Sequence, residues 1–297
     1  MVQGNTSGRA HPLIKRYCCL CRLYSELGFC WGFALGIAGY LNSEEDTAVG
    51  SLFSRASRRR KHLGRSWAAG LMIFVGRLLL VAVVLSVALV LILRWVAPPT
   101  SAFMVGGHLA QLFSSDSRSR IHYHWVDWES ISPNLPLAVV AAEDQKFSRH
   151  AGFDFDSIGK ALEKNRKGGR LRGASTITQQ VAKNLFLWPG KSYLRKGLEA
   201  YFTVLLECLW PKKRILEVYV NIAEFGDGIY GVYAAAESVF GKKPAELTKW
   251  DAALLAAVLP NPKVLQARKP SSYVMERRRW ITTQMRQLNG TEYLQDL

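Results

Sequence analysis

The clearest feature of the hydrophobic pattern is one long apolar run near residue 80. Residues 71–93 are interrupted only by Arg77, and residues 78–93 carry no charge. A helix of this length, rising about 1.5 Å per residue, can cross a hydrocarbon core of about 30 Å, where it satisfies its own backbone hydrogen bonds. The pattern therefore predicts one membrane-spanning helix, in a segment that we place at residues 67–97.

The charges on either side of this run predict its orientation. Six basic residues and no acidic one lie between Asp46 and the run, whereas beyond Arg94 the next basic residue is Arg118. By the positive-inside rule, the N-terminus stays in the cytoplasm and the chain lies outside from about residue 96 onward. No small-residue cleavage site follows, so we expect an uncleaved signal anchor. The six basic residues are Arg55, Arg58, Arg59, Arg60, Lys61 and Arg65.

Residues 1–66 are expected to be a poorly defined cytoplasmic extension, to which we assign no chemistry. Its apolar segment 27–41 is shorter than a membrane span requires, so we interpret it as an interfacial helix. Four of the five cysteines lie here without the spacing of a structural zinc site, which favours reduced thiols. Cys208 is alone in residues 98–297, so that part cannot form an internal disulfide.

Residues 98–297 show the helical periodicity and capping signals of a mostly α domain with a single core. Pro136 suits a first helical position before the apolar stretch 137–147. Thr176 and Gln179 have the spacing of a capping box. We expect further helices at 177–188, at 192–211 with Ser192 as cap, at 212–221, and at 252–259 with Thr248 as cap.

Residues 100–130 are expected to connect the span to this helical domain. Within them, residues 121–125 alternate like a short strand. The pair His122 and His124 could suggest a metal site, but it lacks a third ligand and we interpret both as facing solvent.

The formal net charge of +16 is divided equally along the chain. Residues 1–97 hold 12 Lys and Arg against 4 Asp and Glu, and residues 98–297 hold 27 against 19, which leaves +8 in each. The excess is therefore not one patch of the size that nucleic acid needs. A basic outer domain fits anionic lipid or a phosphorylated substrate as well.

Glu143 is a candidate general base because it follows the apolar residues 137–142. Partial desolvation of a carboxylate raises its pKa toward the range that suits proton abstraction. If the helix continues, Glu143, Phe147 and His150 share one face. The alternative is that Glu143 and Asp144 begin an ordinary solvated helix face.

A polar cluster opens the next predicted helix. Small residues at 173 and 174 allow close backbone approach, and a helix N-terminus attracts anions. Hydroxyls, amides and a lysine at this end favour sugar and phosphate recognition over a plain polar turn. The candidate binding residues are Ser175, Thr176, Gln179, Gln180, Lys183 and Asn184.

Glu199 is the second candidate carboxylate because it lies in an otherwise apolar helix, where a charge needs a partner. A surface ion pair with Lys196 is the alternative. Lys183, Lys191 and Arg195 together could hold a pyrophosphate.

Four segments, in order, carry a resemblance to a known family. They are residues 143–152 (EDQKFSRHAG), 173–180 (GASTITQQ), 195–199 (RKGLE) and 213–221 (KRILEVYVN). They resemble the signature blocks of the monofunctional biosynthetic peptidoglycan transglycosylases of glycosyltransferase family 51. The resemblance covers about residues 100–290, with Ala174 where the family commonly has glycine.

The resemblance implies a lysozyme-like α fold in a single-pass protein of the bacterial inner membrane, with a periplasmic catalytic domain. Its substrates would be lipid II and the growing glycan chain, and proteins of cell-wall synthesis are candidate partners; nucleic acid is not. Glu143 would deprotonate the acceptor GlcNAc 4-hydroxyl, which attacks the donor with inversion. Glu199 would assist at the donor pyrophosphate, directly or through a divalent cation such as Mg²⁺, and no metal-ligand set is expected.

The same resemblance assigns roles to the remaining candidates. Lys183, Lys191 and Arg195 would neutralise phosphate charge. The substrate-positioning residues would be Ser175, Thr176, Gln179, Gln180 and Asn184. No serine nucleophile of the transpeptidase type is evident, so we expect glycan strands to be made without being cross-linked.

Two other functions fit the sequence less well. A lysozyme-like hydrolase needs a carboxylate pair but no pyrophosphate-binding cations, so the Lys183, Lys191 and Arg195 cluster favours synthesis. A non-catalytic basic scaffold leaves Glu143 and Glu199 without a role.

Overall fold

The computed structural model describes residues 50–113, 121–166, 175–190 and 192–297. The expected interfacial helix at 27–41 and the candidate residue Lys191 lie outside these ranges. The chain divides into two compact units, Met1–Val87 and Ala88–Leu297.

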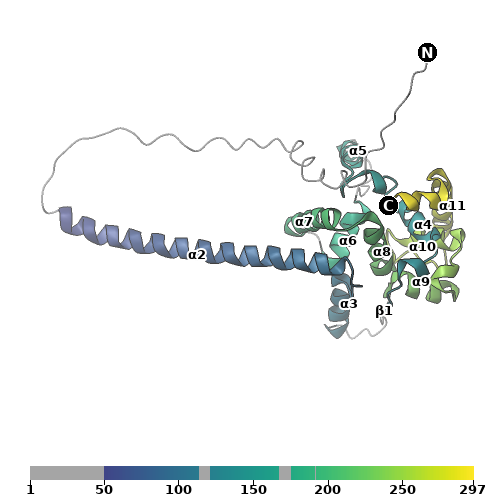
Figure 1. The fold of residues 1–297 in the computed structure, drawn as a ribbon, viewed down its shortest axis with the longest axis horizontal. Coiled ribbons are helices and arrows are strands. Elements are labelled where there is room, and N and C mark those ends of the chain that lie inside the picture. The colour runs from purple at the N-terminus through teal and green to yellow at the C-terminus, as the bar shows by residue number, and fades with distance from the viewer. Residues whose placement is uncertain (1–49, 114–120, 167–174, 191) are drawn as a thin grey trace, which may run out of the picture. The chain divides into compact units, whose positions relative to one another are not determined.

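Helix α2, Gly50–Leu93, contains the predicted span (Figure 1). Its segment Ala69–Leu93 has a mean hydropathy of 2.8, and almost none of it is buried against protein. Side chains such as Leu71, Ile73 and Leu80 therefore present apolar surface to their surroundings. A helix that is apolar on every face and unburied fits a bilayer, so one long apolar helix is present as predicted.

The second unit is mostly helical, as the sequence predicts (Figure 1). Its sheet consists of β1 (His122–Tyr123), β2 (Glu224–Gly226) and β3 (Ile229–Tyr230), in the order β1-β3-β2, with β1 parallel and β2 antiparallel to β3. The strand predicted at 121–125 is thus present but only two residues long. The helices are α3 (Ala102–Phe113), α4 (Asn134–Glu143), α5 (Phe155–Arg166), α6 (Ile177–Phe186), α7 (Tyr193–Leu209), α8 (Lys212–Ile222), α9 (Gly231–Phe240), α10 (Lys249–Val258) and α11 (Ser272–Gln287).

Helix α4 is the centre of the core. All residues from Leu135 to Ala141 are buried, so the helix is covered on every face. It packs against α8, α10 and α11, while α6 packs against α7 and α8. An apolar helix that is buried all round delivers its last residue, Glu143, to the inner part of the domain.

Three predicted helix caps are confirmed. Thr176 forms a capping box with Gln179 at the start of α6. Ser192 accepts a hydrogen bond from Arg195 N at the start of α7, and Thr248 caps α10. Each side-chain oxygen satisfies one of the amide groups that a helix leaves open at its N-terminus.

The prediction that Glu143, Phe147 and His150 share a helix face is wrong. Helix α4 ends at Glu143, because Asp144 takes the non-helical dihedrals φ −158° and ψ 74°. Phe147 begins a separate 3₁₀ turn. The helix also begins at Asn134 rather than at Pro136, and the expected connector 100–130 contains helix α3.

The end of α2 belongs to the second unit and is capped by its side chains. Arg214 donates to the carbonyls of Leu93 and Val96, at 2.9 and 2.8 Å. Trp210 Nε1 donates to Val90 O at 2.8 Å. The bonds to Val90 and Leu93 satisfy carbonyl groups that the C-terminal turn of α2 leaves without partners, and the bond to Val96 holds the chain just beyond the helix.

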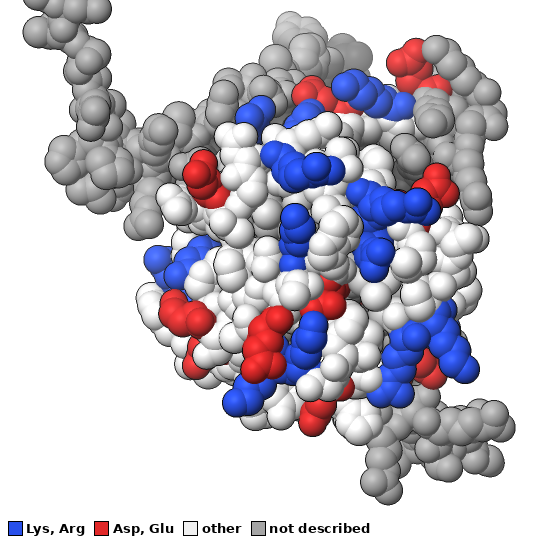
Figure 2. All heavy atoms as spheres, turned by 90° about the vertical axis from the view of Figure 1, so that its right-hand side faces the viewer, with Lys and Arg blue, Asp and Glu red and all other residues white. Residues whose placement is uncertain are grey.

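On the face shown in Figure 2, Lys and Arg side chains are interspersed with Asp and Glu rather than gathered into one patch.

Gly231 and Gly241 provide a test of the fold at the two ends of α9. Both have positive φ, +80° and +65°, but a Cβ at Gly231 would lie 2.3 Å from Asn221 O, whereas one at Gly241 meets nothing within 4 Å. We predict that Gly241→Ala costs about 1–2 kcal/mol of unfolding free energy, the cost of the left-handed conformation alone. Gly231→Ala adds a backbone clash and should cost roughly 3 kcal/mol or more.

Thermal unfolding of both variants in the same detergent measures this difference. Equal melting temperatures for the two variants would contradict the predicted clash.

Candidate functional site

The carboxylate of Glu143 is held from two sides. Its side chain is 15% exposed. Gln180 Nε2, on α6, donates to Oε2 at 3.0 Å, and an Arg277 guanidinium nitrogen, on α11, lies 3.3 Å from Oε1. Three helices therefore fix the position of one carboxylate.

Burial raises the pKa of Glu143, because removal from water disfavours the charged form. The hydrogen bond from Gln180 and the charges of Arg277 and Lys183 act in the opposite direction, lowering the pKa. The Glu143 carboxylate is thus more basic than a carboxylate in water, and hydrogen-bond donors hold it in one orientation. These are the properties of a general base.

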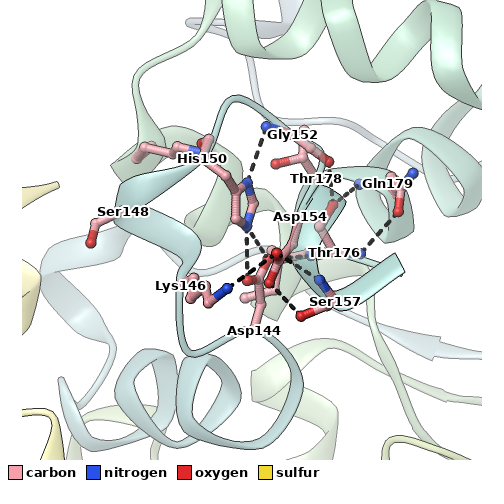
Figure 3. A network of polar contacts seen from close by, with 12 residues as sticks. Asp144, Lys146, Ser148, His150, Gly152, Asp154, Ser157, Thr176, Thr178 and Gln179 are labelled. Carbon is pink, nitrogen blue, oxygen red and sulfur yellow. Dashed lines mark hydrogen bonds and ion pairs between the residues drawn. The ribbon is translucent and has the colours of Figure 1, made fainter. Parts of the chain in front are cut away.

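Asp144, next to Glu143, joins the end of α4 to the start of α6 (Figure 3). Its Oδ2 accepts the backbone N–H of Ile177 at 3.0 Å, and Oδ1 lies 2.9 Å from His150 Nε2. Gly152 N donates to His150 Nδ1 at 3.1 Å. Because Nδ1 accepts, the neutral ring carries its proton on Nε2 and donates it to Asp144.

Further contacts extend this network to α7 and α8. Thr176 Oγ1 donates to Gly152 O at 2.6 Å. Thr178 Oγ1 donates to Glu207 Oε1, which also receives Lys212 Nζ at 2.8 Å. Lys212 Nζ donates as well to His150 O at 2.7 Å. The loop after Glu143 is therefore bonded directly to the start of α6 and to α8, and Glu207 of α7 joins those two helices through Thr178 and Lys212.

A cationic cluster surrounds the second candidate carboxylate. Glu199 is 3% exposed. Arg195 NH1 lies 3.1 Å from Oε2, and Lys196 Nζ contacts Oε1. Arg195 Nε is buried and has no hydrogen-bond partner within the described part of the chain. The surface pair with Lys196 therefore exists, but its carboxylate is buried.

Lys183 connects the two carboxylates electrostatically. Burial lowers its pKa, with the charge of Glu199 acting in the opposite direction and those of Arg195 and Lys196 adding to the decrease. Glu143 also acts on it, raising the pKa. A lysine near both acids and near further cations is a site where an added anion would be stabilised.

The structure brings some of the predicted residues together and separates others. Glu143, Gln180 and Lys183 form one group, with Glu199 and Arg195 beside Lys183. The side chains of Thr176 and Gln179 are instead bonded within the capping box of α6. Ser175 is exposed immediately before this cap, and Asn184 is half-buried on α6.

Three side chains of this network are not identified by the sequence pattern. The pattern indicates Asp144 only as part of a possible solvated face, and it does not indicate Arg277 as a site residue. Tyr219, fully buried on α8, donates its hydroxyl to Gln180 Oε1 at 3.0 Å and so directs the Gln180 amide nitrogen toward Glu143. The Arg277–Arg279 run was a visible signal, but its contact with Glu143 joins residues 134 apart in sequence.

The described residues do not form a metal site at Glu199. They contain no group of three or more His, Cys, Asp and Glu side chains that could hold an ion. Both oxygens of Glu199 are already contacted by cationic side chains. This donor set does not fit a resident divalent cation, which needs several free oxygen ligands.

Comparison with known proteins gives consistent matches. Residues 108–286 match the Transglycosylase family model. The chain is 55% identical over 210 residues to a biosynthetic peptidoglycan transglycosylase of Xanthomonas campestris pv. campestris (strain B100), covering 71% of this chain and 85% of the relative. It is 53% identical over 225 residues to the protein of that name from Xylella fastidiosa (strain M23), covering 75% and 93%.

The family-model match includes the helices that hold Glu143, Gln180, Lys183 and Glu199. The chain therefore belongs to the transglycosylase family and is a peptidoglycan glycosyltransferase.

Proposed function

We propose that this enzyme polymerises glycan strands from lipid II. The growing lipid-linked chain is the donor, and the 4-hydroxyl of the GlcNAc of lipid II is the acceptor. The observation that carries the proposal is a desolvated, oriented Glu143 next to a cluster of cations. One part can accept a proton, and the other can receive a pyrophosphate.

Glu143 is the general base in this proposal. It takes the proton of the acceptor hydroxyl while the oxygen attacks the anomeric carbon of the donor MurNAc. The bond between that carbon and the phosphate oxygen breaks, and the electron pair leaves with undecaprenyl pyrophosphate. Attack opposite the leaving group inverts the centre and gives a β-1,4 bond.

Lys183 and Arg195 stabilise the leaving pyrophosphate, with Lys191 as a further candidate. Preorganised cations act strongly where charge develops in a dry site. The unpartnered Nε of Arg195 remains able to donate to a ligand. Glu199 holds Arg195 and Lys196 in place through its buried carboxylate.

Sugar positioning falls to Ser175, Gln180 and Asn184 in this scheme. Gln180 has a defined amide orientation, since Tyr219 occupies its oxygen. Thr176 and Gln179 contribute through the helix cap that carries these residues.

We further propose that the enzyme is anchored in the bacterial inner membrane with its catalytic unit in the periplasm. The basic residues before the apolar helix support this orientation. We also propose that it lacks transpeptidase activity. The matched relatives, 85–93% of whose length is covered, are named for transglycosylation alone.

Glu143→Gln tests the general base. We predict a loss of lipid II polymerisation of about 10²–10⁴-fold, the usual contribution of such a group. Glu129→Gln, a change in an exposed carboxylate, is the control and should retain activity. Retained polymerisation by Glu143→Gln would refute the assignment.

The same variant has a predicted effect on stability. Because the pKa of Glu143 is raised in the folded state, the folded chain binds this proton more tightly than the unfolded chain. Ionised Glu143 therefore costs stability as pH rises through the interval above its ordinary value of 4.5. The melting temperature of Glu143→Gln should be at least that of the parent near neutral pH. Below the pH interval in which Glu143 ionises, the variant should lose any advantage in melting temperature over the parent.

Arg277→Met tests the electrostatic control of Glu143. The charge of Arg277 lowers the pKa of Glu143, so its removal should raise that pKa. The acid limb of the kcat/KM profile for lipid II should then move to higher pH. Arg279→Met, at an exposed position on the same helix, should leave the limb in place. A shift to lower pH would contradict this account.

Lys183→Ala separates synthesis from hydrolysis. We predict that it lowers lipid II polymerisation by about 10²–10³-fold. Lys249→Ala, a change in an exposed lysine of α10, is the control. If Lys183→Ala instead lost only the digestion of finished glycan, a hydrolase would be favoured.

A further inference from the structure

Helix α11 contacts the end of α4 and the residues that follow it at two points, Glu143 and Gln145. Arg277 reaches Glu143 Oε1 at 3.3 Å. Gln284 Oε1 accepts a hydrogen bond from Gln145 Nε2 at 3.1 Å. Arg277 and Gln284 are seven residues apart, which places them two turns apart on one helix face. This face therefore follows the chain from Glu143 to Gln145.

Trp280 lies on this face between the two contacts. It follows Arg277 by three residues and precedes Gln284 by four, and side chains at these spacings are surface neighbours on a helix. The Trp280 side chain is nevertheless 45% exposed. Tyr273, four residues before Arg277, is 55% exposed. Two aromatic rings thus lie within one helical turn of the arginine that contacts the proposed base, open to solvent.

We propose that Trp280, extended by Tyr273, is a stacking platform for the sugar rings of the acceptor substrate. The inference rests on the proposed function and adds a binding subsite to it. Aromatic rings bury the apolar face of a ligand and fix its plane. A pocket that binds a polar ligand combines such surfaces with a few hydrogen-bonding groups.

The composition of the face favours sugars over a lipid tail. Its remaining members are polar, and Trp280 and Tyr273 are separated along the helix by Arg277 rather than joined by aliphatic residues. An acyl or prenyl chain needs continuous apolar surface, whereas a sugar presents hydroxyl and acetamido groups around a flat apolar ring. The polar members are Glu276, Arg277, Thr283, Gln284 and Gln287.

The position of the platform favours the acceptor over the donor. Glu143 Oε2 is approached by Gln180 on α6, the helix that also carries Lys183 of the cationic cluster. Glu143 Oε1 is approached from α11. If the donor pyrophosphate binds on the side of Glu143 that faces α6 and α7, the acceptor sugar must bind on the opposite side. Trp280 lies on that side, on α11.

The test compares Trp280→Leu with Trp250→Leu. Trp250 is an equally exposed tryptophan on α10, at 46%, whose ring is flanked by Lys249 and Arg278. The donor is a preformed lipid-linked oligosaccharide at a fixed saturating concentration, and the concentration of lipid II is varied. We expect Trp280→Leu to raise the KM for lipid II about five- to tenfold, with kcat within about twofold. Trp250→Leu should behave as the parent.

Trp280→Phe provides the conservative rescue. It keeps an aromatic face and should recover most of the lost affinity for lipid II. If Trp280 only packed against the protein, the affinity would not depend on whether residue 280 carries an aromatic ring. Unchanged melting temperatures for both Trp280 variants exclude a folding defect as the cause. A KM of Trp280→Leu equal to that of the parent, or equal defects in the Leu and Phe variants, would overturn the proposal.

A second acceptor substrate tests whether Trp280 contacts the sugar or the peptide stem of lipid II. With a lipid II analogue that lacks the peptide stem, the KM difference between parent and Trp280→Leu should persist; its disappearance would overturn the assignment to sugar. Glu143→Gln serves as reference. If it is inactive while Trp280→Leu is unaffected, the platform is refuted and the proposed function stands. Activity in Glu143→Gln would instead refute the proposed function.

Discussion

The structure depends on one constraint, the burial of a carboxylate at the end of a helix that is itself buried on every face. Helix α4 has the composition of a core element, and its residues from Leu135 to Ala141 are all buried. Glu143 then emerges in a place that little water reaches. Ionisation there costs free energy, and donors from α6 and α11 offset part of that cost. Stability and reactivity are therefore coupled at this residue.

Asp144 converts this burial into a defined geometry. Its carboxylate accepts hydrogen bonds from the backbone N–H of Ile177 and from the imidazole of His150. Asp144 thereby ends α4 and holds the start of α6 next to that end. Gln180 lies one turn into α6 and is directed toward Glu143 by Tyr219. The position of the Glu143 carboxylate is thus determined by a network of side chains on neighbouring elements. Such supporting contacts keep a catalytic group in one orientation.

At the cationic cluster, repulsion between like charges adds to the effect of desolvation, which is the main effect at Glu143. Around Glu199, like charges lie close together, and the pKa of Lys183 is lowered by burial and by its cationic neighbours. A site of this kind is less favourable when empty than when an anion occupies it. In the proposed function, a pyrophosphate bound at this cluster would relieve the repulsion between the cations, so the affinity for the donor would depend on these charges.

Local signals in the sequence determined much of this protein. The apolar run, the capping residues Thr176, Ser192 and Thr248, and the mostly α character follow from composition and from spacings within a single helical turn. Glu143 and Lys183 could be proposed as site residues, because an acid after an apolar run and a lysine near a helix start are local patterns and because both lie near or within segments that resemble the family. Only the tertiary structure decided that α4 ends at Glu143 and that Arg277 and Tyr219 reach Glu143 and Gln180. These outcomes depend on contacts between residues far apart in the chain, and no local preference encodes which distant side chains packing will bring together.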